Sequence, residues 1–220
     1  RCPKNLDSKE EYNFIKKLSP DIVVISAYGK IIPSSLLNIP NIQFINVHAS
    51  LLPKWRGAAP IQRSIISMEK ETGISIMKVI PKLDAGPFMI QEKIKIEKHD
   101  NYETLSLKLS NLGSKLILDS LKLIEIGKEI FKDQTEQDAT YAKKINKSES
   151  KINWNIPAKK LIAKINGLSP SPGMWFTHNK TRLKIVEAVE VKLEGDAGKV
   201  IDDNLTVACS KNAIKILQIQ

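Results

Sequence analysis

Residues 46–63, Asn-Val-His-Ala-Ser-Leu-Leu-Pro-Lys-Trp-Arg-Gly-Ala-Ala-Pro-Ile-Gln-Arg, decide the fold of this 220-residue chain. The apolar run at residues 44–47 is typical of the end of a buried strand, and side chains two apart on a strand project to the same face. Asn46 and His48 are therefore expected to point the same way. A proline and a glycine then form a turn, and Pro60 opens a helix. This order predicts an α/β sheet with a ligand site at the carboxyl end of the strand.

The two polar side chains of this strand suit acyl-transfer chemistry. An asparagine amide can stabilise a developing oxyanion, and a histidine can carry a proton near neutral pH. On three residues alone, however, the histidine of an Asn-x-His sequence is more often just a hydrogen-bonded residue near a strand end. The chemistry therefore depends on the longer context.

That context resembles the formyltransferases that use 10-formyltetrahydrofolate. A second segment, from Thr72 to Met77 and from Lys82 to Pro87, is similar to a strand of the same family and to its loop with an essential aspartate. By itself, Leu-Asp-x-Gly is only a turn signal. The resemblance makes Asp84 the third member of a catalytic set with Asn46 and His48. In that set Asn46 would hold the oxyanion, His48 would assist or move the proton, and Asp84 would orient the imidazole.

The form of residues 50–63 is most similar to the methionyl-tRNA formyltransferases. The resemblance implies formyl transfer from 10-formyltetrahydrofolate to the α-amine of methionyl initiator tRNA, for translation initiation and without a metal. It also implies residues that bind the formyl donor, in a loop after the preceding strand and in the turn after His48. These are Tyr28, Gly29, Lys30, Ile31, Ile32, Ser50, Leu51, Leu52 and Pro53.

Two other functions stay open. The first is an enzyme of the same chemistry, either a formyltransferase that acts on a sugar nucleotide or another small amine or a hydrolase of formyl-folate. The second is a non-catalytic RNA-binding fragment. Trp55, Arg56 and Arg63 follow the proposed site, where they could shape the acceptor pocket. Arg56 could equally form an ion pair at the surface.

Composition limits the class of protein. The chain is 42% hydrophobic and 26% charged, as in globular proteins, and it has no apolar run of membrane-spanning length and no signal peptide. We therefore expect a cytoplasmic protein, most simply a monomer. Cys2 and Cys209 are isolated, which predicts neither a disulfide framework nor a zinc site.

The positive charge is concentrated towards the C-terminus. The net charge is +10, and residues 140–220 carry 14 basic and 7 acidic side chains, a net of +7. Such an excess favours a polyanionic partner such as RNA. The abundance of Ile, Asn and Lys is also what a nucleotide-biased genome produces, so the charge alone does not decide the partner.

The chain is predicted to contain two domains. Residues 1–127 form a catalytic domain with a partial doubly wound, mainly parallel Rossmann-like sheet, 128–157 a polar linker, and 158–220 a small oligonucleotide-binding-type β-barrel that contacts tRNA. The resemblance implies that the chain, which begins with Arg1, lacks the family's N-terminal segment and the last part of its barrel.

Periodicity and turn residues predict the individual elements. We expect helices over residues 8–18, 60–68, 104–127 and 158–166, strands over 73–80 and 88–96, and a strand buried on both faces over 21–27. Seven leucines should form one apolar face of the long helix; they are Leu105, Leu109, Leu112, Leu116, Leu118, Leu121 and Leu123.

Overall fold

A computed structural model describes residues 2–220, and the chain divides into two compact units. The first unit contains the chain up to Pro60, Gly73–Ile94 and Leu109–Ala142. The second contains Ile61–Thr72, Lys95–Lys108 and Lys143–Gln220. Some elements therefore begin in one unit and end in the other. The predicted domain boundaries, after residue 127 and before residue 158, stay predictions.

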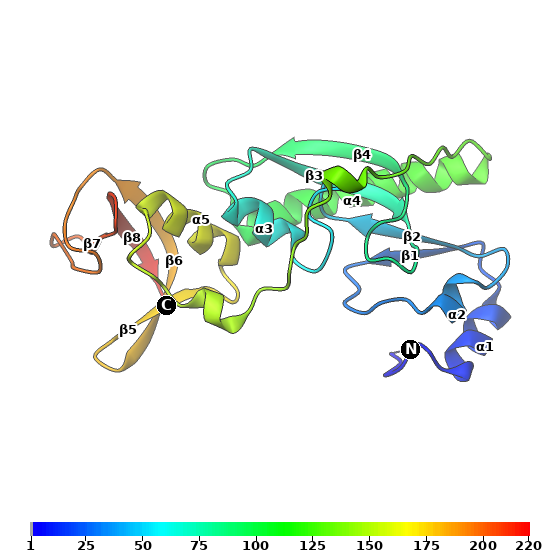
Figure 1. Cartoon of the computed structure of the whole chain (residues 1–220), viewed down its shortest axis with the longest axis horizontal. Coiled ribbons are helices and arrows are strands. Elements are labelled where there is room, and N and C mark those ends of the chain that lie inside the picture. Colours follow the sequence, from blue (N-terminus) through cyan, green and yellow to red (C-terminus); the bar gives the residue numbers. More distant parts are fainter. Residues whose placement is uncertain (1) are drawn as a thin grey trace. The chain divides into compact units, whose positions relative to one another are not determined.

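Helices and strands alternate along the first part of the chain, and strands dominate the last part (Figure 1). In order, the elements are α1 (Lys9–Leu18), β1 (Ile22–Ser26), α2 (Ser34–Leu37), β2 (Gln43–His48), α3 (Pro60–Ile66), β3 (Glu71–Lys78), β4 (Phe88–Lys95), α4 (Tyr102–Glu125), η1 (Glu136–Asp138), η2 (Lys147–Ser150), α5 (Ala158–Leu168), β5 (Met174–His178), β6 (Thr181–Val191), β7 (Thr206–Ala208) and β8 (Ala213–Ile219). The expected α/β fold class is confirmed.

The first helix, α1, begins where the sequence predicted. Ser8 is its N-cap, and the side-chain oxygen of Ser8 accepts a hydrogen bond from the backbone N–H of Glu11 at 3.3 Å. Glu10 and Glu11 lie in the first turn, and Lys16 and Lys17 lie in the last. Both placements complement the helix dipole. The local sequence thus accounts for both ends of α1.

Four strands form the first sheet in the order β1-β2-β3-β4. β1 and β2 are parallel, as residues 21–27 predicted, whereas β2 and β3 are antiparallel, so the sheet is mixed. The prediction that this first strand is buried on both faces was wrong, because Val24 is 44% exposed. β1 is an outer strand of the described sheet, and its apolar composition does not ensure that both faces are covered.

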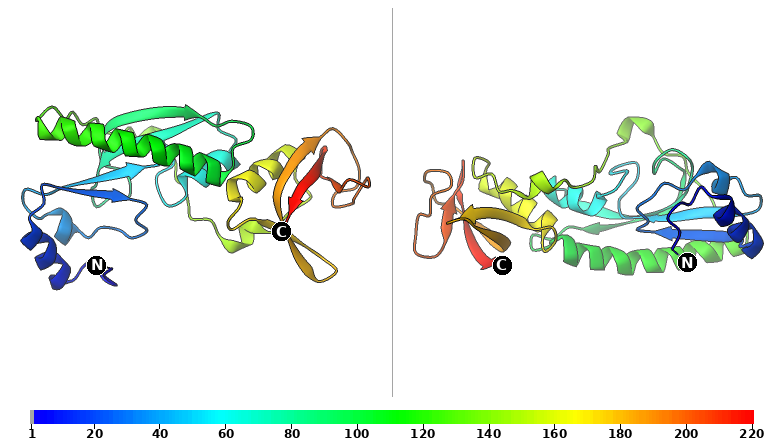
Figure 2. Two further views of the ribbon diagram at one scale, coloured as in Figure 1. Left: turned by 180° about the vertical axis from the view of Figure 1, so that it is seen from behind. Right: turned by 90° about the horizontal axis from the view of Figure 1, so that it is seen from below.

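The long helix α4 packs through a narrower stripe than the leucine pattern predicted. Leu105, Leu109 and Leu116 are 0%, 1% and 4% exposed, but Leu118 is 59% exposed because it lies two residues from Leu116 and off the stripe. At Gly113 a side chain would approach within 3.0 Å of Val47. Glycine therefore lets this part of α4 lie close to the sheet, and Figure 2 shows the helix running along it.

The second sheet is antiparallel, with the strand order β5-β6-β8-β7. The register between β6 and β8 shifts near Glu187, which is an irregularity of the kind that bends strands. The sheet curls as expected for a small barrel, with β5 and β7 as its outer strands (Figure 1).

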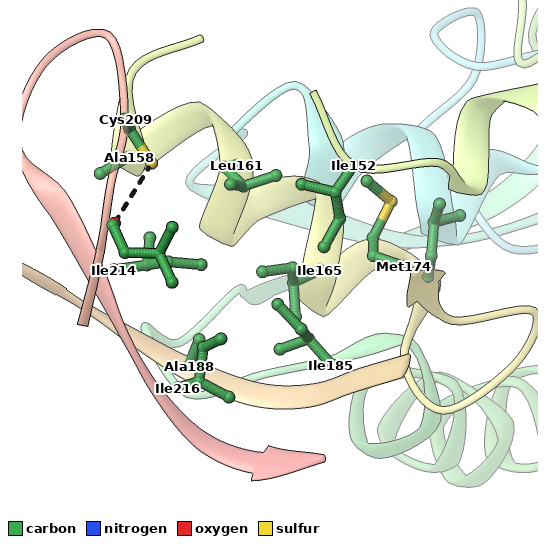
Figure 3. Close-up of a cluster of buried hydrophobic side chains, with 12 residues drawn as sticks. Ile152, Ala158, Leu161, Ile165, Met174, Ile185, Ala188, Cys209, Ile214 and Ile216 are labelled. Atoms are coloured by element: carbon green, nitrogen blue, oxygen red, sulfur yellow. Dashed lines mark hydrogen bonds between the residues drawn. The ribbon is translucent and has the colours of Figure 1, made fainter. Parts of the chain in front are cut away.

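The core of the second unit lies between α5 and this curled sheet (Figure 3). α5 contributes Leu161 and Ile165, and the sheet contributes Ile185 and Ile214, all four with no exposed surface. Trp154 packs against this core and meets Phe176 edge-on, with ring centroids 5.7 Å apart. The ring of Trp154 thus serves in packing.

Candidate active site

Strand β2 places the first two candidate residues. Asn46 and His48 are two positions apart on β2, so their side chains lie on one face of the strand. His48 ends the strand and is only 5% exposed. Asn46 is half-buried, and its side chain makes no hydrogen bond to another of the residues 2–220. The amide of Asn46 is therefore available as a donor.

A backbone carbonyl fixes the orientation of the imidazole. Nε2 of His48 lies 2.9 Å from the carbonyl oxygen of Trp55. A carbonyl oxygen can only accept, so Nε2 must carry the hydrogen. In the neutral ring the other nitrogen, Nδ1, then presents its lone pair. The turn holds this carbonyl with Trp55 in the left-handed region, at φ 62°.

The third candidate approaches Nδ1 from a separate loop. Oδ2 of Asp84 lies 3.8 Å from Nδ1 of His48, and the Asp84 side chain is 17% exposed. The backbone N–H of Gly57 donates to the same oxygen at 2.8 Å. At 3.8 Å the two side chains are too far apart for a direct hydrogen bond. With the neutral ring, two acceptors therefore face each other, and a donor group that lies between them could bond to both atoms.

The turn after β2 is held by one buried hydroxyl. Ser75 is fully buried; its Oγ donates to the carbonyl of Ser50 at 2.6 Å and accepts from the N–H of Leu52 at 3.0 Å. Gln91 donates to this hydroxyl and to the carbonyl of Leu52. The side chains of Ser50 and Leu52 are buried, and the peptide between Leu52 and Pro53 is cis. The hydrogen bonds of Ser75 and Gln91 thus tie together the turn that is predicted to bind the formyl donor.

The other part of the predicted binding site for the formyl donor, at residues 28–32, is more open. Tyr28 and Ile31 are 43% and 73% exposed, and Nζ of Lys30 donates to the carbonyl of Lys4 at 2.8 Å. Because β1 and β2 are parallel, their carboxyl ends meet at one edge of the sheet. The loop at 28–32 and the turn at 50–53 therefore leave the sheet at the same edge.

The alternative of an ion pair for Arg56 is confirmed, with Glu136 as its partner, but the Arg56 side chain is completely buried and does not lie at the surface. Nε of Arg56 donates to Oε1 of Gln134 at 2.9 Å, and Nη1 donates to Oε1 of Glu136 at 3.0 Å. Sequence reasoning missed both acceptors. They lie in the polar segment 128–157, where no motif distinguishes them from a linker.

Arg63 is likewise engaged within the protein. Its guanidinium makes two hydrogen bonds to the carboxylate of Glu149, at 2.7 and 3.0 Å, and donates to the carbonyls of Lys143 and Lys144. The hydrogen bond from Arg63 holds the pKa of Glu149 below its usual value. Since its donors are occupied, Arg63 fastens the segment 143–149 and does not offer a free cation to an acceptor.

The second unit has a lysine-lined hollow of about 310 Å³ beside the start of α5. Lys159, Lys160 and Lys211 line it, and Glu190 is the one acidic residue among its lining residues. Within residues 2–220, no cluster of His, Cys, Asp and Glu could hold a metal ion, and no helix is long and apolar enough to cross a membrane.

Comparison with solved structures shows the fold. HypX from Aquifex aeolicus in complex with tetrahydrofolic acid has a TM-score of 0.76 at 15% identity, over 94% of this chain and 37% of that one. An N-formyltransferase from Helicobacter canadensis in complex with folinic acid and dTDP-3-aminofucose has a TM-score of 0.72 at 18% identity, over 88% of this chain and 71% of that one.

Comparison of sequences shows the family. A methionyl-tRNA formyltransferase of Pelagibacter ubique is 50% identical over 222 residues, which cover 100% of this chain and 72% of the relative. The one of Caldanaerobacter subterraneus is 42% identical over 99% of the chain and 72% of the relative. Residues 2–121 match the formyl transferase family and residues 144–220 match the formyl transferase C-terminal domain. This chain therefore belongs to the formyl transferase family of enzymes, among the methionyl-tRNA formyltransferases.

Proposed function

We propose that this chain moves a formyl group from 10-formyltetrahydrofolate to the α-amine of methionine on initiator tRNA, in the cytoplasm. The observation that carries the proposal is the approach of Asp84 to His48 at the end of β2, at 3.8 Å. On the same strand face as His48 lies the side-chain amide of Asn46, which makes no hydrogen bond to any other residue of the described range 2–220. An oxyanion donor and a proton acceptor are what formyl transfer between two nitrogens requires.

The proposed steps assign one task to each side chain. The neutral amine attacks the formyl carbon, a C–N bond forms, and the carbonyl electrons move to oxygen, where the amide of Asn46 donates to the oxyanion. The proton lost by the attacking nitrogen goes to Nδ1 of His48. Collapse of the tetrahedral centre breaks the C–N bond to the folate, and the same proton passes to the leaving folate nitrogen.

Asp84 assists through charge. While His48 holds the proton, both ring nitrogens carry hydrogen, and the one on Nδ1 faces the carboxylate 3.8 Å away. Attraction between the imidazolium and Asp84 stabilises this intermediate, as the carboxylate of a catalytic triad stabilises its protonated histidine. The carbonyl of Trp55 keeps the ring in place throughout, because Nε2 retains its own hydrogen.

The two substrates are assigned to different parts of the chain. The formyl donor would bind along residues 28–32 and 50–53, which share one edge of the sheet. The tRNA would contact residues 140–220, whose net charge is +7 from 14 basic and 7 acidic side chains. The hollow lined by Lys159, Lys160 and Lys211 offers a place for phosphate groups.

A direct assay tests the proposal. The chain is incubated with 10-formyltetrahydrofolate and methionyl initiator tRNA, and formylated methionine is measured. We expect turnover, with a loss of about 10²- to 10³-fold for Asn46→Ala and of about 10²- to 10⁴-fold for His48→Ala. His178→Ala is the matched control, because His178 is exposed and, within the described part of the chain, its side chain bonds only to that of its neighbour Asn179.

Other outcomes would overturn it. Turnover with a small amine or sugar nucleotide but not with tRNA would favour the small-substrate alternative, and tRNA binding without turnover would favour the RNA-binding fragment. Folded Asn46→Ala and His48→Ala proteins that keep the activity of the His178→Ala control would remove both residues from the mechanism.

A further inference from the structure

Gln134 holds the loop that carries Asp84. The side-chain Nε2 of Gln134 donates to the backbone carbonyl of Asp84 at 2.9 Å and to that of Gly86 at 2.7 Å. Both hydrogens of the amide are therefore used on one loop. The orientation of the amide is unambiguous, because its other end accepts from Nε of Arg56, which can only donate.

The loop between β3 and β4 needs such a partner. Asp84 lies in the left-handed region at φ 45°, which is costly for a residue other than glycine. Leu83, next to it, is 50% exposed, so few apolar contacts hold the tip of the loop. Gly86 passes so close to the backbone of Lys78 that an added Cβ would collide with the carbonyl. The two hydrogen bonds from Gln134 therefore act where packing is weak.

Arg56 in turn fixes Gln134. The Arg56 side chain is fully buried, and besides Gln134 it binds Glu136 two residues further on. The backbone of Arg56 pairs with the same chain segment, from its N–H to the carbonyl of Thr140 and from its carbonyl to the N–H of Ala142. Gly57, the next residue, donates to the carboxylate of Asp84. The backbone and the carboxylate of Asp84 are thus both held from the Arg56–Gly57 segment.

We infer that Gln134, held by Arg56, is a positioning residue that sets the distance between the Asp84 carboxylate and His48. The inference rests on the proposed catalytic role of Asp84. The hydrogen bonds from Gln134 to the loop go to backbone carbonyls, so Gln134 acts on the reaction through the position of Asp84. Displacements of about 1 Å at a catalytic group can cost about 10²-fold in rate, so a loop clamp of this kind has a measurable effect.

Two matched variants test the inference. Gln134→Met keeps the length of the side chain and removes its hydrogen bonds. Gln137→Met is the control, because Gln137 lies three residues away, is exposed, and its side chain makes no hydrogen bond to another of the residues 2–220. Hydrogen exchange at the amide of Ala85, which donates to the carbonyl of Lys82 at 3.3 Å within the same loop, is measured first, since it needs no activity. We expect exchange to rise at least about tenfold in Gln134→Met and not in Gln137→Met.

Kinetics then separate positioning from general support of the fold. We expect Gln134→Met to lower kcat about 10- to 100-fold with KM nearly unchanged, and Gln137→Met to match the parent. In an Asp84→Asn background, Gln134→Met should cost less than about twofold, because the group that it positions is already lost.

Each contrary result has its own meaning. Unchanged exchange at the Ala85 amide in Gln134→Met would overturn the inference that Gln134 holds this loop. Faster exchange with a parental kcat, or a full loss of kcat that persists in the Asp84→Asn background, would overturn the link to Asp84. If Asp84→Asn alone kept full activity, the proposed function of Asp84 would fail instead, and the exchange result would still decide whether Gln134 holds the loop.

Discussion

The backbone N–H of Gly57 donates a 2.8 Å hydrogen bond to Oδ2 of Asp84, the same oxygen that faces Nδ1 of His48. Gly57 adopts φ +113°, and a Cβ there would lie 3.0 Å from the carbonyl oxygen of Ala142. An alanine would therefore strain the backbone and press against the chain segment that contains Ala142. We predict that Gly57→Ala loses about 1 to 3 kcal/mol of stability, and also loses formyl transfer because the donor to Asp84 moves.

Thermal unfolding and the formylation assay check this prediction together. Gly127→Ala is the matched control, because Gly127 also has a positive φ, +63°, but an added Cβ would meet nothing within 4 Å. We expect the control to lose some stability and no activity. A Gly57→Ala protein that melts at a lower temperature with full activity would separate the Gly57 amide from the chemistry.

Much of the fold could be predicted because its signals are local. The cap at Ser8, the proline that opens α3 and the periodicity of α4 each involve residues within a few positions of one another. The same holds for Asn46 and His48, whose common face follows from their spacing on a strand. The assignment of Asp84 needed the resemblance, because its own motif is only a turn.

The rest could not be predicted because it depends on distant partners. Arg56 is separated from Gln134 by 78 residues and from Glu136 by 80, and neither acceptor belongs to a motif. The exposed face of Val24 depends on what covers β1, which an apolar run does not specify. In the same way, Arg63 could not be distinguished from an acceptor-binding cation until its four hydrogen bonds to residues 143–149 were known.

Ser75 should be the most sensitive polar residue of the sheet. Its hydroxyl donates to the carbonyl of Ser50 and accepts from the N–H of Leu52 and from the side-chain amide of Gln91, all at 3.0 Å or less. Ser75→Ala leaves a buried N–H and a buried carbonyl without this partner, at about 1 to 3 kcal/mol for each unsatisfied group. We predict a lower free energy of unfolding in urea, together with weaker binding of the formyl donor as the turn loosens.

The control for Ser75 is Ser114→Ala. Ser114 is an exposed residue of α4, and its hydroxyl donates to the carbonyl of Ser110 at 2.8 Å, one turn earlier in the same helix. Such bonds add little to a helix, so we expect a change within about 0.5 kcal/mol. Equal effects of the two substitutions would mean that the Ser75 network does not stabilise the turn.

Asp100 should make stability depend on acid pH. Burial alone would raise the pKa of this carboxyl, which is 2% exposed, but hydrogen bonds from Lys108, the Glu97 N–H and Thr104 outweigh burial and lower the pKa overall. A carboxyl whose pKa is lowered by folding stabilises the protein above its unfolded pKa, and this contribution disappears as the pH falls through the folded pKa.

The free energy of unfolding, measured in urea from neutral pH downwards, tests this. We expect Asp100→Asn to be less stable than the parent at pH 7, and the difference to shrink below about pH 4. Asp119→Asn is the control, because Asp119 is 47% exposed and pairs with Lys122 only at 3.8 Å. A constant difference between Asp100→Asn and the parent at all pH values would show that ionisation of Asp100 is not the cause.

The two cysteines should differ sharply in reactivity. Cys209 is 1% exposed in the core of the second unit (Figure 3), and burial raises the pKa of its thiol to about 11. Only the thiolate is nucleophilic, so little of the reactive form exists near neutral pH. Cys2 is exposed.

We predict that iodoacetamide labels the folded chain once, at Cys2, and twice after unfolding in urea. Mass spectrometry of the intact chain and of a Cys2→Ser variant measures this, and the variant should stay unlabelled until it unfolds. Rapid labelling of the folded Cys2→Ser variant would mean that the core around Ile214 and Val207 opens far more easily than its burial implies.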